Sequence, residues 1–154
     1  MVNLILPNSY AKEIDQSRLA TAFLEGIKVL KLAKNTSLTV RVTNNRLIRQ
    51  FNLAWRGENS PTDVLSFENA YTDPETGEKY LGDIVISFEK ARQQALVAGH
   101  SIQSEIELLF VHGLLHLAGF DHDQKEEWAE MTKTQDQILK NIGNPLKGGI
   151  QYNE

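Results

Sequence analysis

Residues 81–87 read LGDIVIS, and this stretch decides the kind of fold that the chain adopts. Because it is almost entirely apolar, it predicts a strand that is buried on both faces and lies in the centre of a sheet. Three further strands are predicted: one at residues 2–6, one at 37–43 (SLTVRVT), where β-branched residues alternate with period two, and one opened by Pro61 in PTDVLSFE.

Between and after these strands, apolar residues recur at helical spacing. They predict a helix that Asn44 or Asn45 caps and that ends just before Arg56, and further helices at about 16–33, 88–98, 102–118 and 124–141. Residues 69–79 contain Asp-Pro and Thr-Gly pairs, which predict a mobile loop. The order of elements indicates an α+β fold: one domain over residues 1–154, in which a mixed four-stranded sheet packs against helices.

Composition narrows the classes of function. The chain has 154 residues and no cysteine, so any metal must be held by His, Asp or Glu. Neither a secretory signal nor a membrane-spanning stretch is recognisable, and we expect a cytoplasmic protein without a membrane partner.

The net charge of −4 argues against a generic polycationic binder of nucleic acids. Four of the six arginines nevertheless fall within sixteen residues that hold no acid: Arg41, Arg46, Arg49 and Arg56. This segment either lines a path for a polyanion such as RNA or simply solvates a helix face, and the charge pattern leaves both interpretations open.

Residues 112–122 read HGLLHLAGFDH and carry the chemistry of the chain. His112 and His116 are separated by one helical turn, so their rings project from one face. Gly119 is placed to end the helix, after which His122 can return to the same point. Three imidazoles in this arrangement predict the ligands of one zinc ion with an open fourth position, although nickel or another divalent metal would suit them as well.

The spacing of the three histidines equals that of the metzincin proteases, so the helix at 102–118 is predicted to be a zincin-like metal helix. The glutamate that acts as general base in those proteases is Gly113 in this chain. Glu105 and Glu107 lie one to two turns upstream and are not placed to replace it. The pattern therefore favours a metal-dependent hydrolase that is not a standard protease.

Taken with PTDVLSF at 61–67 and LGDIVIS at 81–87, the histidine motif resembles the YbeY family of bacterial endoribonucleases. The similarity extends from about residue 38 to 140, and Asp123, Met131 and Gln135 also match familiar positions of the family.

The resemblance implies a metal-dependent, single-strand-specific endoribonuclease with an α+β fold. It implies roles in the maturation of the 3′ end of 16S ribosomal RNA and in ribosome quality control. The expected partners are single-stranded RNA, the small ribosomal subunit and ribosome-associated proteins. His112, His116 and His122 would be the metal ligands, and the important arginine of the family maps to Arg56.

Several other side chains are candidates for the site. Arg56 would clamp a phosphate through its bidentate guanidinium, unless it pairs structurally with Glu58 or Asp63. Asp83 and Asp121 would either orient a histidine or, in the case of Asp83, cap a loop. His100 is expected to interact with a helix C-terminus rather than with a metal.

The aromatic residues of this region, Trp55 and Phe67, are expected in the core rather than as platforms for RNA bases, because of their apolar periodicity.

Two other functions remain open at this point. The same histidines would serve a metallopeptidase-like hydrolase, although Gly113 argues against it. Alternatively, the chain is a non-catalytic ribosome assembly factor with a structural metal, in which Asp123 could close the fourth coordination position.

Overall fold

A computed structural model of the chain describes residues 1–120, 125–144 and 146. Its elements follow one another along the chain as β1 (Val2–Ile5), α1 (Asn8–Ala11), α2 (Gln16–Leu30), β2 (Thr36–Thr43), α3 (Asn45–Arg56), β3 (Val64–Thr72), β4 (Lys79–Ser87), α4 (Phe88–Ala98), α5 (Ile102–Leu117) and α6 (Lys125–Asn141). None of the helices in these ranges is both long and apolar enough to cross a bilayer.

The four strands form one mixed sheet, as predicted, and their order in it is β1-β2-β4-β3. β1 runs parallel to β2 and β2 parallel to β4, whereas β3 pairs antiparallel with β4. β4 therefore lies in the interior of the sheet, which confirms the expectation for LGDIVIS. β3 forms one edge, and its outer half, from Glu68 to Thr72, is exposed.

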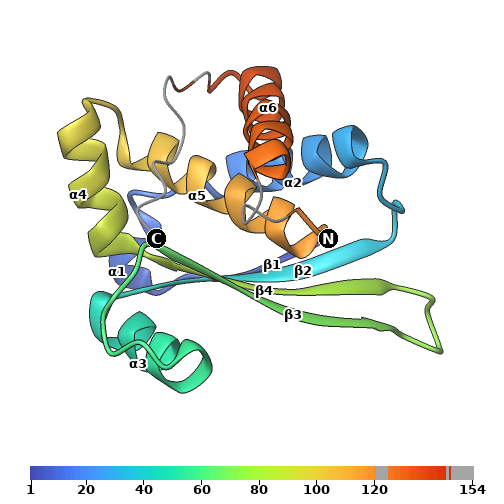
Figure 1. The fold of residues 1–154 in the computed structure, drawn as a ribbon, viewed down its shortest axis with the longest axis horizontal. Coiled ribbons are helices and arrows are strands. Elements are labelled where there is room, and N and C mark those ends of the chain that lie inside the picture. The colour runs from blue at the N-terminus through green and yellow to red at the C-terminus, as the bar shows by residue number, and fades with distance from the viewer. Residues whose placement is uncertain (121–124, 145, 147–154) are drawn as a thin grey trace.

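The helices are distributed unequally over the two faces of the sheet (Figure 1). α2, α4, α5 and α6 lie on one face, and α5 crosses the sheet within that layer. The main core lies between this layer and the sheet, where Val40 and Ile84 pack with Phe110 and Leu114 of α5. On the other face, α3 covers one end of the sheet, where Ile48 packs on Val85.

The predicted helix boundaries agree closely with the structure. Asn44 caps α3, because its side chain accepts a hydrogen bond from the backbone N–H of Leu47 at 2.8 Å. Arg56 is the last residue of α3 rather than the first beyond it, and Gly57 follows with φ of 73° in the left-handed region. The four-residue helix α1 is not predicted from the sequence.

The prediction of a loop over residues 69–79 is wrong at both ends. β3 continues to Thr72 and β4 begins at Lys79, so that only the six residues between them form the turn. Tyr71 and Tyr80 face each other across the two strands, with their ring centroids 5.5 Å apart. This cross-strand aromatic pair extends the hairpin beyond the point where turn-forming residues become frequent.

An irregularity in β4 sets which of its side chains face each layer. The register between β3 and β4 shifts between Glu68 and Tyr71, and Gly82, at φ of 147°, lies opposite this shift. The register between β2 and β4 also shifts, with one extra residue in β4 between Tyr80 and Asp83. Leu81 and Ile84 consequently both pack in the main core, while Asp83 lies on the α3 face with Val85. A Cβ atom at position 82 would lie 2.2 Å from the carbonyl oxygen of Phe67.

We therefore expect Gly82→Ala to destabilise the protein by at least about 3 kcal/mol, because the clash with a backbone atom adds to conformational strain of roughly 1–3 kcal/mol. Gly57→Ala is the matched control. It also has positive φ, but no atom lies within 4 Å of the added Cβ, and its cost should be near 1 kcal/mol. The midpoints of urea denaturation measure the loss of stability in both variants. Equal losses would show that the close approach at position 82 is unimportant.

Candidate metal and RNA site

Two of the three predicted ligands come together in the last turns of α5. The Nε2 atoms of His112 and His116 lie 3.1 Å apart, and their rings meet edge to face with centroids 4.6 Å apart. His112 is buried, and His116 is half-buried, so the pair is reached from the side of His116. The one-turn spacing of the two histidines therefore places both rings on the same face of α5, as predicted.

Each ring has a hydrogen-bond partner for its other nitrogen. The Nδ1 atom of His116 lies 3.2 Å from the carbonyl oxygen of Phe120, which can only accept, and Nδ1 of His112 lies 3.0 Å from Oε1 of Gln135. A proton on each Nδ1 leaves the lone pairs of both Nε2 atoms directed at each other. Two such lone pairs repel at this distance unless a proton or a cation lies between them.

This donor set fits a metal ion. Two nitrogen ligands of one tetrahedral zinc ion are roughly 3.3 Å apart, given zinc–nitrogen bonds of about 2.0–2.1 Å, and the observed separation is close to that value. The bonds from Nδ1 to Gln135 and to Phe120 are of the kind that orient metal-binding histidines in other proteins. No group of three potential ligands forms among the residues that the structure describes.

Two of the predicted site residues, Asp121 and the third ligand His122, lie outside the described residues, as does Asp123. His122 as the third metal ligand, Asp121 as an orienting carboxylate and Asp123 as a fourth ligand therefore stay predictions.

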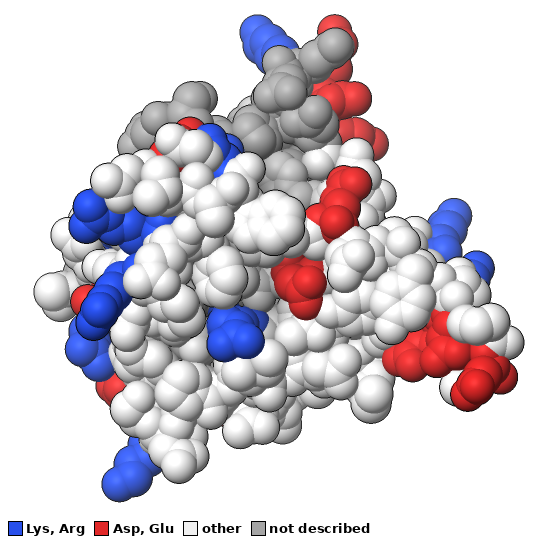
Figure 2. Space-filling model, turned by 90° about the horizontal axis from the view of Figure 1, so that it is seen from below, with Lys and Arg blue, Asp and Glu red and all other residues white. Residues whose placement is uncertain are grey.

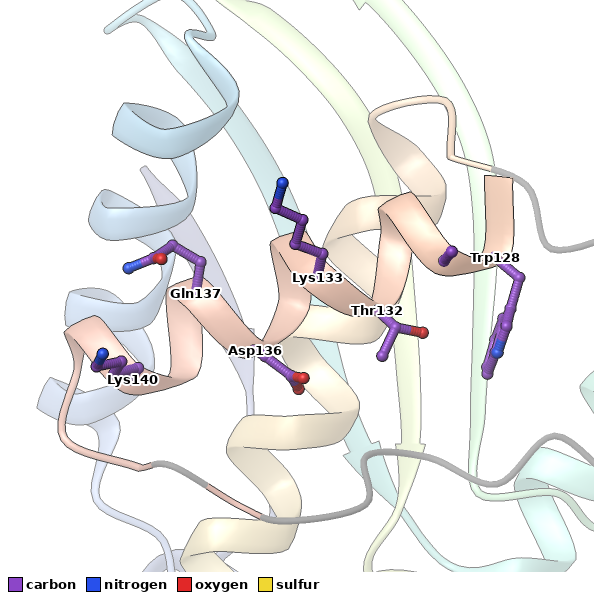
Figure 3. Close-up of a pocket in the computed structure, with 7 residues that line it drawn as sticks. Trp128, Thr132, Lys133, Asp136, Gln137 and Lys140 are labelled. Carbon is purple, nitrogen blue, oxygen red and sulfur yellow. The ribbon is translucent and has the colours of Figure 1, made fainter. Parts of the chain in front are cut away.

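Gln135 is a partner of the site whose role the sequence alone does not predict. α6 presents an inner face of Met131, Gln135, Ile138 and Leu139, all buried. A single amide within an otherwise apolar helical stripe must find a hydrogen-bond partner, and this pattern was the available signal. The outer face of the same helix is different: Figure 3 shows Lys133, Asp136, Gln137 and Lys140 around a shallow hollow.

At Gly113 the backbone of α5 comes close to the sheet. Ser66 of β3 donates a hydrogen bond to the carbonyl oxygen of Gly113 at 3.2 Å. An added Cβ atom would lie 2.9 Å from Cγ2 of Ile84 and 3.1 Å from Oγ of Ser66. The position where metzincins carry their general base therefore faces strands of the sheet, and it has no space for a glutamate.

The two upstream glutamates are engaged elsewhere. Glu107 is buried and accepts two hydrogen bonds from the guanidinium of Arg18, at 2.6 and 2.7 Å. Oε1 of Glu105 lies 2.6 Å from Nε2 of His100, and burial raises the pKa of Glu105. The ring of His100 thus contacts a carboxylate in the first turn of α5, while its backbone N–H donates to the carbonyl oxygen of Ala95 at the C-terminus of α4 at 3.1 Å. Neither glutamate is placed to act on the histidine pair.

Asp83 contacts none of the three histidines that the structure describes, His100, His112 and His116. It lies on the α3 face of β4, and its Oδ1 accepts a hydrogen bond of 2.6 Å from the hydroxyl of Tyr80, which also contacts Thr39 at 2.7 Å. Burial, with a smaller contribution from the bond to Asp83, raises the pKa of Tyr80 to about 12. Tyr80 is therefore a neutral donor at physiological pH, and Asp83 belongs to a polar group on the opposite side of the sheet from α5.

Arg56 lies at the exposed end of α3, also on that opposite side. Neither Glu58 nor Asp63, both within the described part of the chain, forms an ion pair with it. Asp63 instead accepts hydrogen bonds from the backbone of Val64 and from Gln94. The structural pairings considered for Arg56 are therefore not the ones that form.

The prediction that Trp55 belongs to the core is wrong. Its side chain is 71% exposed, because the last turn of α3 extends past the apolar contacts that Ile48 makes with the sheet. Phe67 is half-buried, and its ring centroid lies 5.6 Å from that of Trp55.

The contact at Gly113 provides a test of how α5 packs on the sheet. We expect Gly113→Ala to cost roughly 1–3 kcal/mol, the usual range for overpacking, and Gly113→Glu to cost more because a carboxylate would be buried against Ile84. Thermal unfolding measures the loss of stability in both variants. Casein cleavage shows whether the added glutamate creates a protease. Wild-type stability of Gly113→Glu would contradict the packing described here.

Comparison with known proteins agrees with this architecture. The family model described as "Endoribonuclease YbeY" matches residues 6–143. The endoribonuclease YbeY of Syntrophomonas wolfei is 42% identical over 87% of this chain and 90% of its own length, and that of Sulfurihydrogenibium is 40% identical over 91% and 93%. That of Gloeobacter violaceus is 37% identical over 92% of this chain and 75% of its own length.

A solved structure shares the fold. TM1509 from Thermotoga maritima superposes with a TM-score of 0.57 at 21% identity, covering 98% of this chain and 100% of its own. The family match spans the edge strand, the central strand and the histidine helix, the three elements from which the site is built. The chain is a member of the YbeY family of endoribonucleases.

Proposed function

We propose that this protein is a metal-dependent endoribonuclease that cuts single-stranded RNA during the maturation of ribosomal RNA, including the 3′ end of 16S RNA. The observation that carries the proposal is the pair of Nε2 atoms 3.1 Å apart, each ring held by a partner on Nδ1, in a chain of the YbeY family. A cytoplasmic location, contact with the small ribosomal subunit and associated proteins, and a role in ribosome quality control belong to the same proposal.

His112, His116 and His122 would hold the ion, with zinc as the first candidate and nickel or another divalent metal as alternatives. Bound there, the ion supplies Lewis acidity towards a phosphate oxygen and lowers the pKa of a water ligand. Gln135 and the carbonyl oxygen of Phe120 hold both imidazoles in the tautomer that presents Nε2.

RNA would reach the site over the edge of the sheet. β3 is an edge strand, and its two faces differ: Ser66 contacts Gly113 of α5, whereas Phe67 faces α3. A strand of RNA that crosses this edge can contact both. Arg56, at the end of α3, would bind a phosphate through its planar guanidinium and offset negative charge there.

The packing at Gly113 supports a nuclease over a peptidase. Peptide hydrolysis on this scaffold relies on a glutamate beside the first histidine, and the sheet occupies that space. Cleavage of a phosphodiester depends more on stabilisation of charge at the phosphate, which a cation and an arginine provide.

The contribution of Gln135 to metal binding is testable without an activity assay. We expect Gln135→Leu to weaken zinc binding roughly 10- to 100-fold, because the His112 ring loses the acceptor that orients it. Gln137→Leu, on the outer face of α6, is the matched control and should bind zinc like the wild type. Calorimetric titration of the metal-free proteins measures both, and an unchanged affinity in Gln135→Leu would contradict the role assigned to this amide.

The activity itself is tested with purified protein, single-stranded RNA and casein. We expect the wild type to cut RNA and not casein, and His116→Ala or a chelated sample to lose at least about 100-fold in rate, as expected when metal chemistry is removed. Arg56→Lys keeps the charge but loses the bidentate geometry, so its rate should fall as well.

Each rival function has its own outcome in this assay. RNA cleavage that survives both chelation and His116→Ala would reveal a contaminating nuclease, and casein cleavage would indicate a peptidase. Stoichiometric metal binding without cleavage of either substrate would indicate an assembly factor. Wild-type activity in Arg56→Lys would remove Arg56 from the proposal.

A further inference from the structure

The face of the sheet that α3 leaves bare contains a hollow of about 690 Å³. β2 contributes Thr39 and Arg41 to it, β4 contributes Asp83, and the aromatic residues of α3 and β3 form one wall. Its volume lies within the range of roughly 300–1,000 Å³ that is usual for small-ligand sites. Figure 2 shows this face of the molecule: acidic groups and a basic group lie near its centre among uncharged atoms, and further Lys and Arg gather towards the end where α3 lies.

Aromatic rings line the hollow in a row. The ring of Phe67 contacts two others: its centroid lies 6.1 Å from that of Phe51 and 5.6 Å from that of Trp55. The outermost ring, Trp55, is 71% exposed. A large aromatic surface left in water at the rim of a hollow is unfavourable for the isolated protein, and it is the type of surface on which single-stranded nucleic acids stack their bases.

The charged groups of the hollow make one part of it suited to a phosphate and another part suited to a base. The side chain of Arg41 forms no hydrogen bond or ion pair with any residue in the described ranges, and it is half-buried. Glu68, Asp83 and Asn69 line the hollow too. Carboxylates repel a phosphate but accept hydrogen bonds from the amino group of a base, so the aromatic and acidic part suits a base and Arg41 suits its phosphate.

We infer that this hollow binds one unstacked base of a single-stranded RNA. The base stacks on Trp55 and Phe67, and Arg41 pairs with the neighbouring phosphate. The inference rests on the proposed function and deepens it, since the hollow and the histidine pair lie on the two sides of the edge strand β3. It also supplies a reason for selectivity towards single strands, because a base within a duplex cannot enter the hollow.

Trp55 can report on this binding directly, because the chain has only one other tryptophan, Trp128. In a His116→Ala, Trp128→Phe protein, which keeps Trp55 as its sole fluorophore of this type, we expect a short oligocytidylate to quench the fluorescence. A double-stranded RNA of the same length should leave it unchanged. Quenching by the duplex, or none by oligocytidylate, would overturn the inference.

Affinity measurements on variants give a second, independent readout. In the His116→Ala protein, we expect Trp55→Ala to raise the Kd for oligocytidylate roughly 5- to 150-fold, the effect of losing one stacked base, and Trp55→Phe to retain most of the affinity. Tyr71→Ala is the matched control, since this exposed tyrosine lies on the hairpin outside the hollow. Equal affinities of Trp55→Ala and the control would contradict stacking.

The role of Arg41 appears in the salt dependence. Arg41→Gln should reduce the slope of log K against log salt concentration by about 0.7, the value for one phosphate contact of a single strand. Arg46→Gln removes the same charge from α3, outside the hollow, and should leave the slope unchanged. If Arg41→Gln behaves like Arg46→Gln while the wild type cleaves RNA, the inference fails and the proposed function stands; if the wild type neither binds nor cleaves RNA, both fail.

Discussion

The close packing of α5 on the sheet at Gly113 is the constraint on which the rest of the site depends. Because position 113 has no side chain, the helix backbone lies against Ile84 and accepts a hydrogen bond from Ser66. This contact sets the height and rotation of the helix, and with them the direction in which His112 and His116 project. It also occupies the space of a protease's general base, so the same contact that positions the two histidines separates this chain from the peptidases with the same histidine spacing.

The sheet divides two kinds of chemistry between its faces. The α5 face holds two imidazoles whose Nδ1 atoms are both engaged, an arrangement suited to a cation. The α3 face holds exposed aromatic rings and Arg41, an arrangement suited to an RNA strand. The edge strand β3 belongs to both faces, and Asp83 lies on the α3 face because it alternates with Ile84, which packs in the main core.

Local sequence patterns predict most of the helices and strands correctly. They fail where contacts between residues far apart in the chain determine the structure. Period-two alternation found β2, and the apolar run found the central β4. The outer hairpin was missed because Tyr71 and Tyr80 pair across strands, and a window along the chain does not contain that contact. Trp55 was wrongly assigned to the core because helical periodicity shows which residues share a face, but not how far the opposing sheet extends beneath it.

The sequence by itself determined the fold class, the central strand and the convergence of His112 and His116, because each follows from spacing within one strand or one helical turn. Only the tertiary structure decided what surrounds them: Gln135 on His112, the sheet against Gly113, Asp83 on the far face, and the hollow beside Trp55. These depend on contacts between residues that are distant in the chain, and the relative positions of packed elements are set by the shapes of whole side-chain layers rather than by any one segment.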